Sequence, residues 1–128
     1  MNKLPKLPFL MASRWSQAAF LTLILVVSWL AFTPNPPPRI DLGWDKANHA
    51  SAFATLLISA IWAWPRQQRW LPLALLGYGG FIEIVQSFIP GRDGDWHDLV
   101  ADAFGLLVGF LLFALLRKLL HLRFTESP

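Results

Sequence analysis

The chain of 128 residues contains no cysteine and few charged residues. Without cysteine there is no disulfide, no thiolate metal site and no thiol nucleophile. Charged residues make up only 15% of the chain and hydrophobic residues 55%. Four long segments, residues 15–32, 47–64, 70–89 and 99–116, hold only two formal charges between them, Glu83 and Asp102. This segregation excludes a water-soluble globule with a mixed surface and indicates an integral membrane protein.

Several familiar catalytic motifs are missing as well. The sequence has no Gly-x-Ser-x-Gly, no His-Glu-x-x-His and no glycine-rich phosphate-binding loop. No internal repeat is visible, which argues against an inverted-repeat transporter. Any chemistry must therefore come from the few polar residues that lie within or beside the apolar segments.

Each apolar segment is long enough to cross a bilayer as a helix, because about 20 residues span the hydrocarbon thickness of roughly 30 Å. The apolar runs are continuous rather than alternating, which favours helices over the strands of a barrel. We predict an all-α fold, an integral membrane four-helix bundle that forms a single membrane domain over residues 1–128. The predicted transmembrane helices are residues 15–32, 47–64, 70–89 and 98–116.

The basic residues predict the orientation of these helices. Eight of the 11 lie on the side of the membrane that holds both termini: Lys3, Lys6, Arg14, Arg66, Arg69, Arg117, Lys118 and Arg123. This bias predicts cytoplasmic N- and C-termini, in a multi-pass protein of a bacterial cytoplasmic (inner) membrane. Membrane topology and contact with anionic lipid account for the excess of basic over acidic residues, so no nucleic-acid partner is expected.

The same topology brings the polar residues of the predicted spans to the outer face. His49, Glu83 and Asp102 come from three helices and lie at a similar depth. A charged side chain near the middle of a membrane costs about 2.5 to 3.5 kcal/mol, so it normally faces the bundle interior, a partner or a water-filled cavity. We predict a polar pocket at the outer face, with these three residues as candidate catalytic groups.

Other polar residues surround this predicted pocket. The predicted ligand-binding residues are Asp45, Lys46, Gln86, Arg92, Asp95 and Asp98. The guanidinium of Arg92 is suited to a phosphate or carboxylate, and Asp98 has an alternative role as the N-cap of the last helix. No cofactor is predicted, although histidine and carboxylates together would suit a divalent metal. Gly105 and Gly109 form a G-x-x-x-G pattern, for which packing inside the bundle is favoured over a dimer interface.

Three motifs follow one another in order along the chain. They are Asp45-Lys46-x-x-His49-x-x-x-Phe53, then Glu83-x-x-Gln86-x-Phe88-x-Pro90-Gly91-Arg92, then Asp95-x-x-Asp98-x-x-x-Asp102-x-x-Gly105-x-x-x-Gly109. This string, over residues 45–109, resembles the VanZ-like family of small bacterial membrane proteins, named after an accessory determinant of teicoplanin resistance. The resemblance implies a role in the cell envelope and specifies no reaction. At the position of Asp102 the family frequently has Asn.

Three functions remain open at this point. In the first, the outer pocket binds or processes a lipid-linked or amphipathic molecule of the cell envelope, with membrane lipids as partners. In the second, the protein is an intramembrane enzyme that acts on a lipid or lipid-phosphate by acid/base or metal-assisted chemistry, with Glu83 or His49 as general base. The third is proton-coupled transport through the same groups. We rank them in this order.

Overall fold

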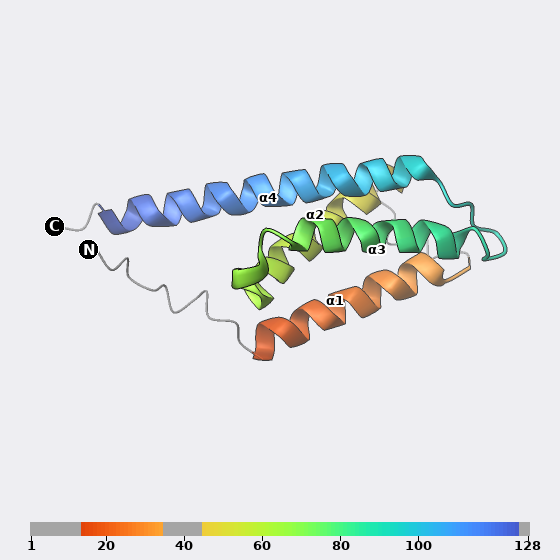
Figure 1. Ribbon diagram of the computed structural model, residues 1–128, viewed down its shortest axis with the longest axis horizontal. Helices are drawn as coiled ribbons and strands as arrows, with labels where there is room; N and C mark the ends of the chain where they lie inside the picture. Colours follow the sequence, from red (N-terminus) through yellow and green to blue (C-terminus); the bar gives the residue numbers. More distant parts are fainter. Residues whose placement is uncertain (1–13, 35–44, 126–128) are drawn as a thin grey trace.

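The computed structural model describes residues 14–34 and 45–125, which form an all-helical architecture (Figure 1). Its elements are α1 (Arg14–Phe32), α2 (Asp45–Ala63), the short 3-10 helix η3 (Pro65–Gln67), α3 (Leu71–Gln86) and α4 (Trp96–Thr125). Within these two ranges there is no strand, so the predicted all-α class is confirmed. The connection between the first two helices lies mostly outside the described residues.

The chain direction alternates from helix to helix. As a result, α2 begins, α3 ends and α4 begins at one end of the structure, while α1 begins and α4 ends toward the other end (Figure 1). We call the first of these the polar end, because it carries Lys46, His49, Glu83, Asp98 and Asp102.

Three helix boundaries differ from the predicted ones at the polar end, the first being the start of α2, at Asp45 rather than at residue 47. Helix α3 ends at Gln86 rather than at residue 89, because the chain then turns: the Ile89 N–H bonds to the carbonyl of Gln86 at 3.0 Å, and Gly91 adopts a φ of 80°. A positive φ costs glycine little, since it has no Cβ.

Helix α4 begins earlier than predicted, at Trp96. The carboxylate of Asp95, the residue just before it, accepts the backbone N–H of His97 at 2.9 Å, which is the bond an N-cap residue makes to the second helical position. Asp98 lies inside the first turn of α4. The alternative prediction that Asp98 caps this helix is therefore wrong, and its side chain is free for other contacts.

The most extensive helix contact joins α2 to α4. A Cβ on Gly105 would collide with the backbone carbonyl oxygen of Ala50, and one on Gly109 would lie 2.8 Å from that of Ala54. The G-x-x-x-G face thus brings the two backbones close together within one chain, in agreement with the predicted packing inside the bundle.

A small apolar core lies between the helices. Its most deeply buried side chains include Phe53, Leu56, Leu57 and Ile61 of α2 together with Ile82 of α3. Helix α1 contributes no fully buried residue. It contacts α3 partly through polar groups, such as the 2.7 Å hydrogen bond between the hydroxyls of Ser28 and Tyr78.

Among the described residues, two helical segments are long and apolar enough to cross a membrane, α1 and residues 96–120 of α4. Helix α3 is apolar but has only 16 residues, which corresponds to about 24 Å. Large hydrophobic side chains nevertheless cover the outside of three helices: Leu21, Leu25, Val26 and Trp29 of α1, Leu73, Phe81 and Ile84 of α3, and Phe104, Leu107 and Leu111 of α4 are all exposed.

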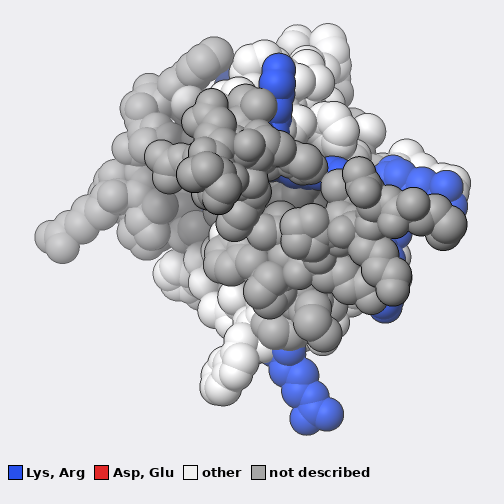
Figure 2. Space-filling model, turned by 90° about the vertical axis from the view of Figure 1, so that its left-hand side faces the viewer, with Lys and Arg blue, Asp and Glu red and all other residues white. Residues whose placement is uncertain are grey.

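The end opposite the polar end is basic. In the view onto it, the described atoms include Lys and Arg side chains and no Asp or Glu (Figure 2). Arg14, Arg66, Arg69, Arg117 and Lys118 belong to the segments that meet there.

The glycine contacts make a testable prediction for the α2–α4 interface. Gly105→Ala is expected to lower the free energy of unfolding by about 1 to 3 kcal/mol, because its methyl group has no space beside Ala50. Gly80→Ala is the matched control, since a Cβ there meets nothing within 4 Å. Chemical unfolding of the two variants in the same detergent measures the difference. Equal stability of both would contradict a close α2–α4 contact.

Candidate functional site

Three helix ends supply the side chains of the polar end. His49 lies in the second turn of α2, Glu83 in the last turns of α3, and Asp102 in the second turn of α4. Asp102 is fully buried, and its Oδ1 lies 2.9 Å from Nδ1 of His49. Because an ionised carboxylate only accepts hydrogen bonds, the imidazole donates this one. A buried polar pair of this kind is held in one geometry, because either group without its hydrogen bond would be costly to bury.

Glu83 completes the group. One of its oxygens, Oε2, accepts the backbone N–H of Asp95 at 2.7 Å. Its other oxygen, Oε1, is buried without a hydrogen-bond partner among the described residues, and the same holds for Oδ2 of Asp102. One donor atom from each of His49, Glu83 and Asp102 lies within 4.8 Å of the others. The three predicted candidates are therefore brought together.

Gly79 of α3 leaves the space that Asp102 occupies. A Cβ on Gly79 would lie 2.5 Å from Oδ2 of Asp102. Gly79 also precedes Glu83 by four residues, so both lie on the same face of α3. Any larger residue at this position would displace the buried carboxylate.

Lys46, Asp95 and Asp98 form a second layer closer to the surface. Lys46 Nζ lies 3.2 Å from Asp98 Oδ1 and 3.5 Å from Asp95 Oδ2. The side chain of Asp98 is nearly buried, and its Oδ2 lies 3.6 Å from Nε2 of His49. Asp45, at the exposed start of α2, has an oxygen within 4.8 Å of donor atoms of His49 and Asp98. His49 thus stands between two carboxylate groups, one facing each ring nitrogen.

His97 is a neighbour of this layer that the sequence reasoning missed. Its ring Nδ1 lies 2.6 Å from Oδ1 of Asp95. Hydrogen bonds from the backbone and ring of His97 hold the pKa of Asp95 below its usual value, so Asp95 stays ionised beside Lys46. The available signal was the position of His97, two residues after an aspartate that precedes a helix.

Gln86 and Arg92 direct their described bonds toward α1. The amide nitrogen of Gln86 donates to the carbonyl of Ala31 at 3.0 Å. Arg92 Nη2 donates to the carbonyls of Leu30 at 2.8 Å and Thr33 at 3.0 Å. The last four carbonyls of a helix have no partner within the helix. These two residues therefore close the end of α1, and their role in ligand binding stays a prediction.

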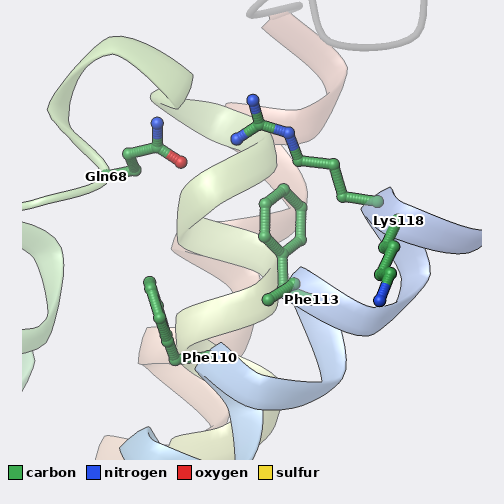
Figure 3. A pocket seen from close by; sticks show the side chains of 6 residues that line it. Gln68, Phe110, Phe113 and Lys118 are labelled. Carbon is green, nitrogen blue, oxygen red and sulfur yellow. The ribbon is translucent and has the colours of Figure 1, made fainter. Parts of the chain in front are cut away.

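A cavity of about 320 Å³ lies at the opposite, basic end (Figure 3). It is lined by Gln68, Phe110, Phe113, Ala114, Arg117 and Lys118. Phe110 and Phe113 give it an apolar wall, and Arg117 and Lys118 provide positive charge. This combination is typical of a surface that meets anionic lipid.

The fold and the polar end together define a class: a small helical protein with membrane-length helices and a buried histidine–carboxylate cluster at one end. A family model described as VanZ/LLP1 matches residues 8–117. The chain belongs to this family, and the resemblance noted from the three motifs is confirmed.

A fission-yeast relative shows that such sequences also occur outside bacteria. The chain is 32% identical over 106 residues to the Schizosaccharomyces pombe protein named "Uncharacterized protein C11E3.10". The matched region covers 79% of this chain and 64% of the yeast protein, so the chain spans less than two thirds of that relative. No solved structure matches the chain. The predicted bacterial cytoplasmic membrane stays a prediction.

The contacts of Arg92 make a prediction for α1. Arg92→Ala is expected to increase hydrogen–deuterium exchange in the last turn of α1, because the carbonyls of Leu30 and Thr33 lose their donor. Arg66→Ala, at the other end of the bundle, is the control and should leave this segment unchanged. Unchanged exchange in Arg92→Ala would show that the guanidinium does not hold α1.

Proposed function

We propose that this VanZ/LLP1-family chain is a multi-pass membrane protein that binds the polar head group of an amphipathic membrane molecule at its polar end. The observation that carries this proposal is the fully buried Asp102, paired with His49 and adjacent to Glu83. A cell-envelope lipid or lipid-linked molecule fits the role that the family resemblance implies.

The outer surface of the helices supports a membrane setting. Leu25, Leu73, Ile84 and Phe104 are each at least 60% exposed. Soluble monomers rarely expose contiguous apolar patches of more than a few hundred square ångströms, whereas lipid tails satisfy such surfaces. In this proposal α2 and α3 also cross the bilayer, with α3 tilting little because it is short.

The distribution of charge supports the predicted orientation. The described residues of one end are basic and those of the polar end carry most of the acids. The positive-inside rule would then place the basic end and both termini in the cytoplasm. The polar end would face the outer leaflet, where the head group of an envelope lipid or lipid-linked molecule lies.

The polar end brings carboxylate acceptors of α3 and α4 close together. Glu83 and Asp102 each have an oxygen without a partner in the described residues. Such oxygens accept hydrogen bonds from hydroxyl or amino groups of a head group. Binding here requires no movement of Gln86 or Arg92 away from α1.

A second candidate function, catalysis, is favoured by the geometry of His49. Asp102 orients the imidazole through Nδ1, and Nε2 faces the surface layer near Asp98. A histidine held in this way by a buried carboxylate is the arrangement of a general base. The protein would then bind a lipid or lipid-phosphate and also activate water or a hydroxyl against it.

Lipid retention tests the proposal. Native mass spectrometry of the purified chain is expected to detect a retained lipid. Glu83→Ala is expected to lose it because an acceptor is removed, and His49→Ala because Asp102 loses the hydrogen bond that holds its carboxylate in position. Arg66→Ala is the control that should retain it. Retention by both polar-end variants at the level of the unmodified protein would contradict the proposed site.

The same variants separate binding from catalysis. For an enzyme, His49→Gln is expected to retain lipid and to stop its conversion, measured by chromatography of the lipid after incubation. Conversion at an unchanged rate would remove His49 as the base.

A further inference from the structure

We infer that His49, Glu83 and Asp102 hold a divalent transition-metal cation, of the Mn²⁺ or Zn²⁺ type. This inference deepens the proposed head-group site. It rests on the proposed function for the molecule that the cation would contact, the head group of the bound lipid. It gives the two carboxylate oxygens that lack a hydrogen-bond partner a specific role, as ligands of the cation.

The two unpartnered oxygens are the first support. Buried polar atoms normally have a hydrogen-bond partner, and an unmatched carboxylate oxygen is especially costly. Here Asp102 is completely buried, and neither its Oδ2 nor Oε1 of Glu83 has a hydrogen-bond partner in the described part of the chain. Both residues belong to the same three-residue group, whose donor atoms all lie within 4.8 Å of one another. A cation between them would satisfy both carboxylates at once.

The donor set is the second support. One imidazole nitrogen and two carboxylate oxygens are ligands that Zn²⁺ and Mn²⁺ accept, and three protein ligands leave coordination positions open. A metal-bound histidine usually donates its other N–H to a carboxylate. With the cation at Nδ1, the proton of His49 moves to Nε2, which lies 3.6 Å from Oδ2 of Asp98. A carboxylate thus stands on the side of that proton, and a small approach of Asp98 would complete the hydrogen bond.

The charge around the group is the third support. Gly79 lets Oδ2 of Asp102 approach α3 one helical turn from Glu83, so the two carboxylates come close together. Among the described residues the polar end carries more acids than fixed cations: its acids are Asp45, Glu83, Asp93, Asp95, Asp98 and Asp102, against Lys46 and Arg92. Both fixed cations are engaged elsewhere, Lys46 with Asp95 and Asp98 and Arg92 with α1.

This balance has a consequence for the head group. A net-negative site repels phosphate or carboxylate, whereas a cation with open positions attracts their oxygens. The bound cation would therefore allow the polar end to hold an anionic head group. Without it, the site would favour a head group with hydroxyl or amino donors.

Cobalt binding tests the inference. The full chain, purified in detergent and stripped with a chelator, is titrated with Co²⁺ and followed by visible absorption and elemental analysis. The unmodified protein is expected to bind about one cobalt per chain. Glu83→Gln and His49→Gln are each expected to weaken binding by at least about tenfold.

Two matched variants locate the cation. Asp45→Asn and Asp98→Asn alter the neighbouring group of Asp45, His49 and Asp98. Asp45→Asn should bind cobalt as the unmodified protein does, and Asp98→Asn should lose less than Glu83→Gln, since it removes only an outer partner. Loss in Asp45→Asn with retention in Glu83→Gln would overturn the assignment. Glu83→Gln keeps the oxygen that accepts the Asp95 N–H, and its thermal unfolding confirms that it is folded.

Lipid retention, measured on the same samples, separates this inference from the proposed function. Lipid without cobalt binding in the unmodified protein overturns the cation site and leaves the head-group site. Cobalt binding without lipid supports the cation site and overturns the head-group function. Cobalt binding that is equal in all variants overturns the assignment to these three residues.

Discussion

The buried carboxylate of Asp102 is the constraint on which the rest of the polar end depends. An ionised carboxylate removed from water needs compensation, and only His49 provides a described hydrogen bond to it. That bond fixes how α2 and α4 face each other. It also fixes the imidazole between two carboxylates, since Asp98 lies on the side of the other ring nitrogen. The head-group site and the catalytic alternative both use this hydrogen bond, whereas a cation bound at Nδ1 would replace it and keep His49 and Asp102 together as its ligands.

The pair requires the two helices to be unusually close. Gly105 and Gly109 allow this, because their backbones lie against those of Ala50 and Ala54 without side chains between them. Gly79 does the same for α3, where Asp102 needs the space. Glycines at three positions therefore allow the close helix packing that positions His49 and Asp102 at the polar end. In a membrane, where apolar side chains gain little from contacting each other rather than lipid, such close packing is a principal source of helix association.

Much of this organisation was predictable from the sequence. The four long apolar segments predicted all four α-helices, and the alternation of their direction predicted that His49, Glu83 and Asp102 share one end. The ends of helices were less predictable. Asp95 and Asp98 both lie where the last apolar run begins, so the sequence does not tell which of them caps the helix. The backbone geometry shows that Asp95 is the N-cap and Asp98 the third helical residue.

The sequence did not predict which neighbouring helix each polar side chain contacts. The spacing of Gln86 and Arg92 places them near the polar end, but it carries no information on whether they face the cluster or α1. Their direction depends on where α1 packs, which follows from contacts between residues about 55 to 62 positions apart. The space beside Gly79 likewise arises only when α3 meets α4. Tertiary packing therefore decides which of the polar residues belong to the core of the site.

The central claim is that His49 and Asp102 act as one buried unit, and a double-mutant cycle tests it most directly. Unfolding free energies are measured for the unmodified chain, His49→Gln, Asp102→Asn and the double variant in one detergent. A buried pair predicts a coupling energy of about 1 kcal/mol or more, within the range seen for residues in direct contact. Effects that add to within about 0.3 kcal/mol would contradict the account, because they would show that the two side chains do not interact.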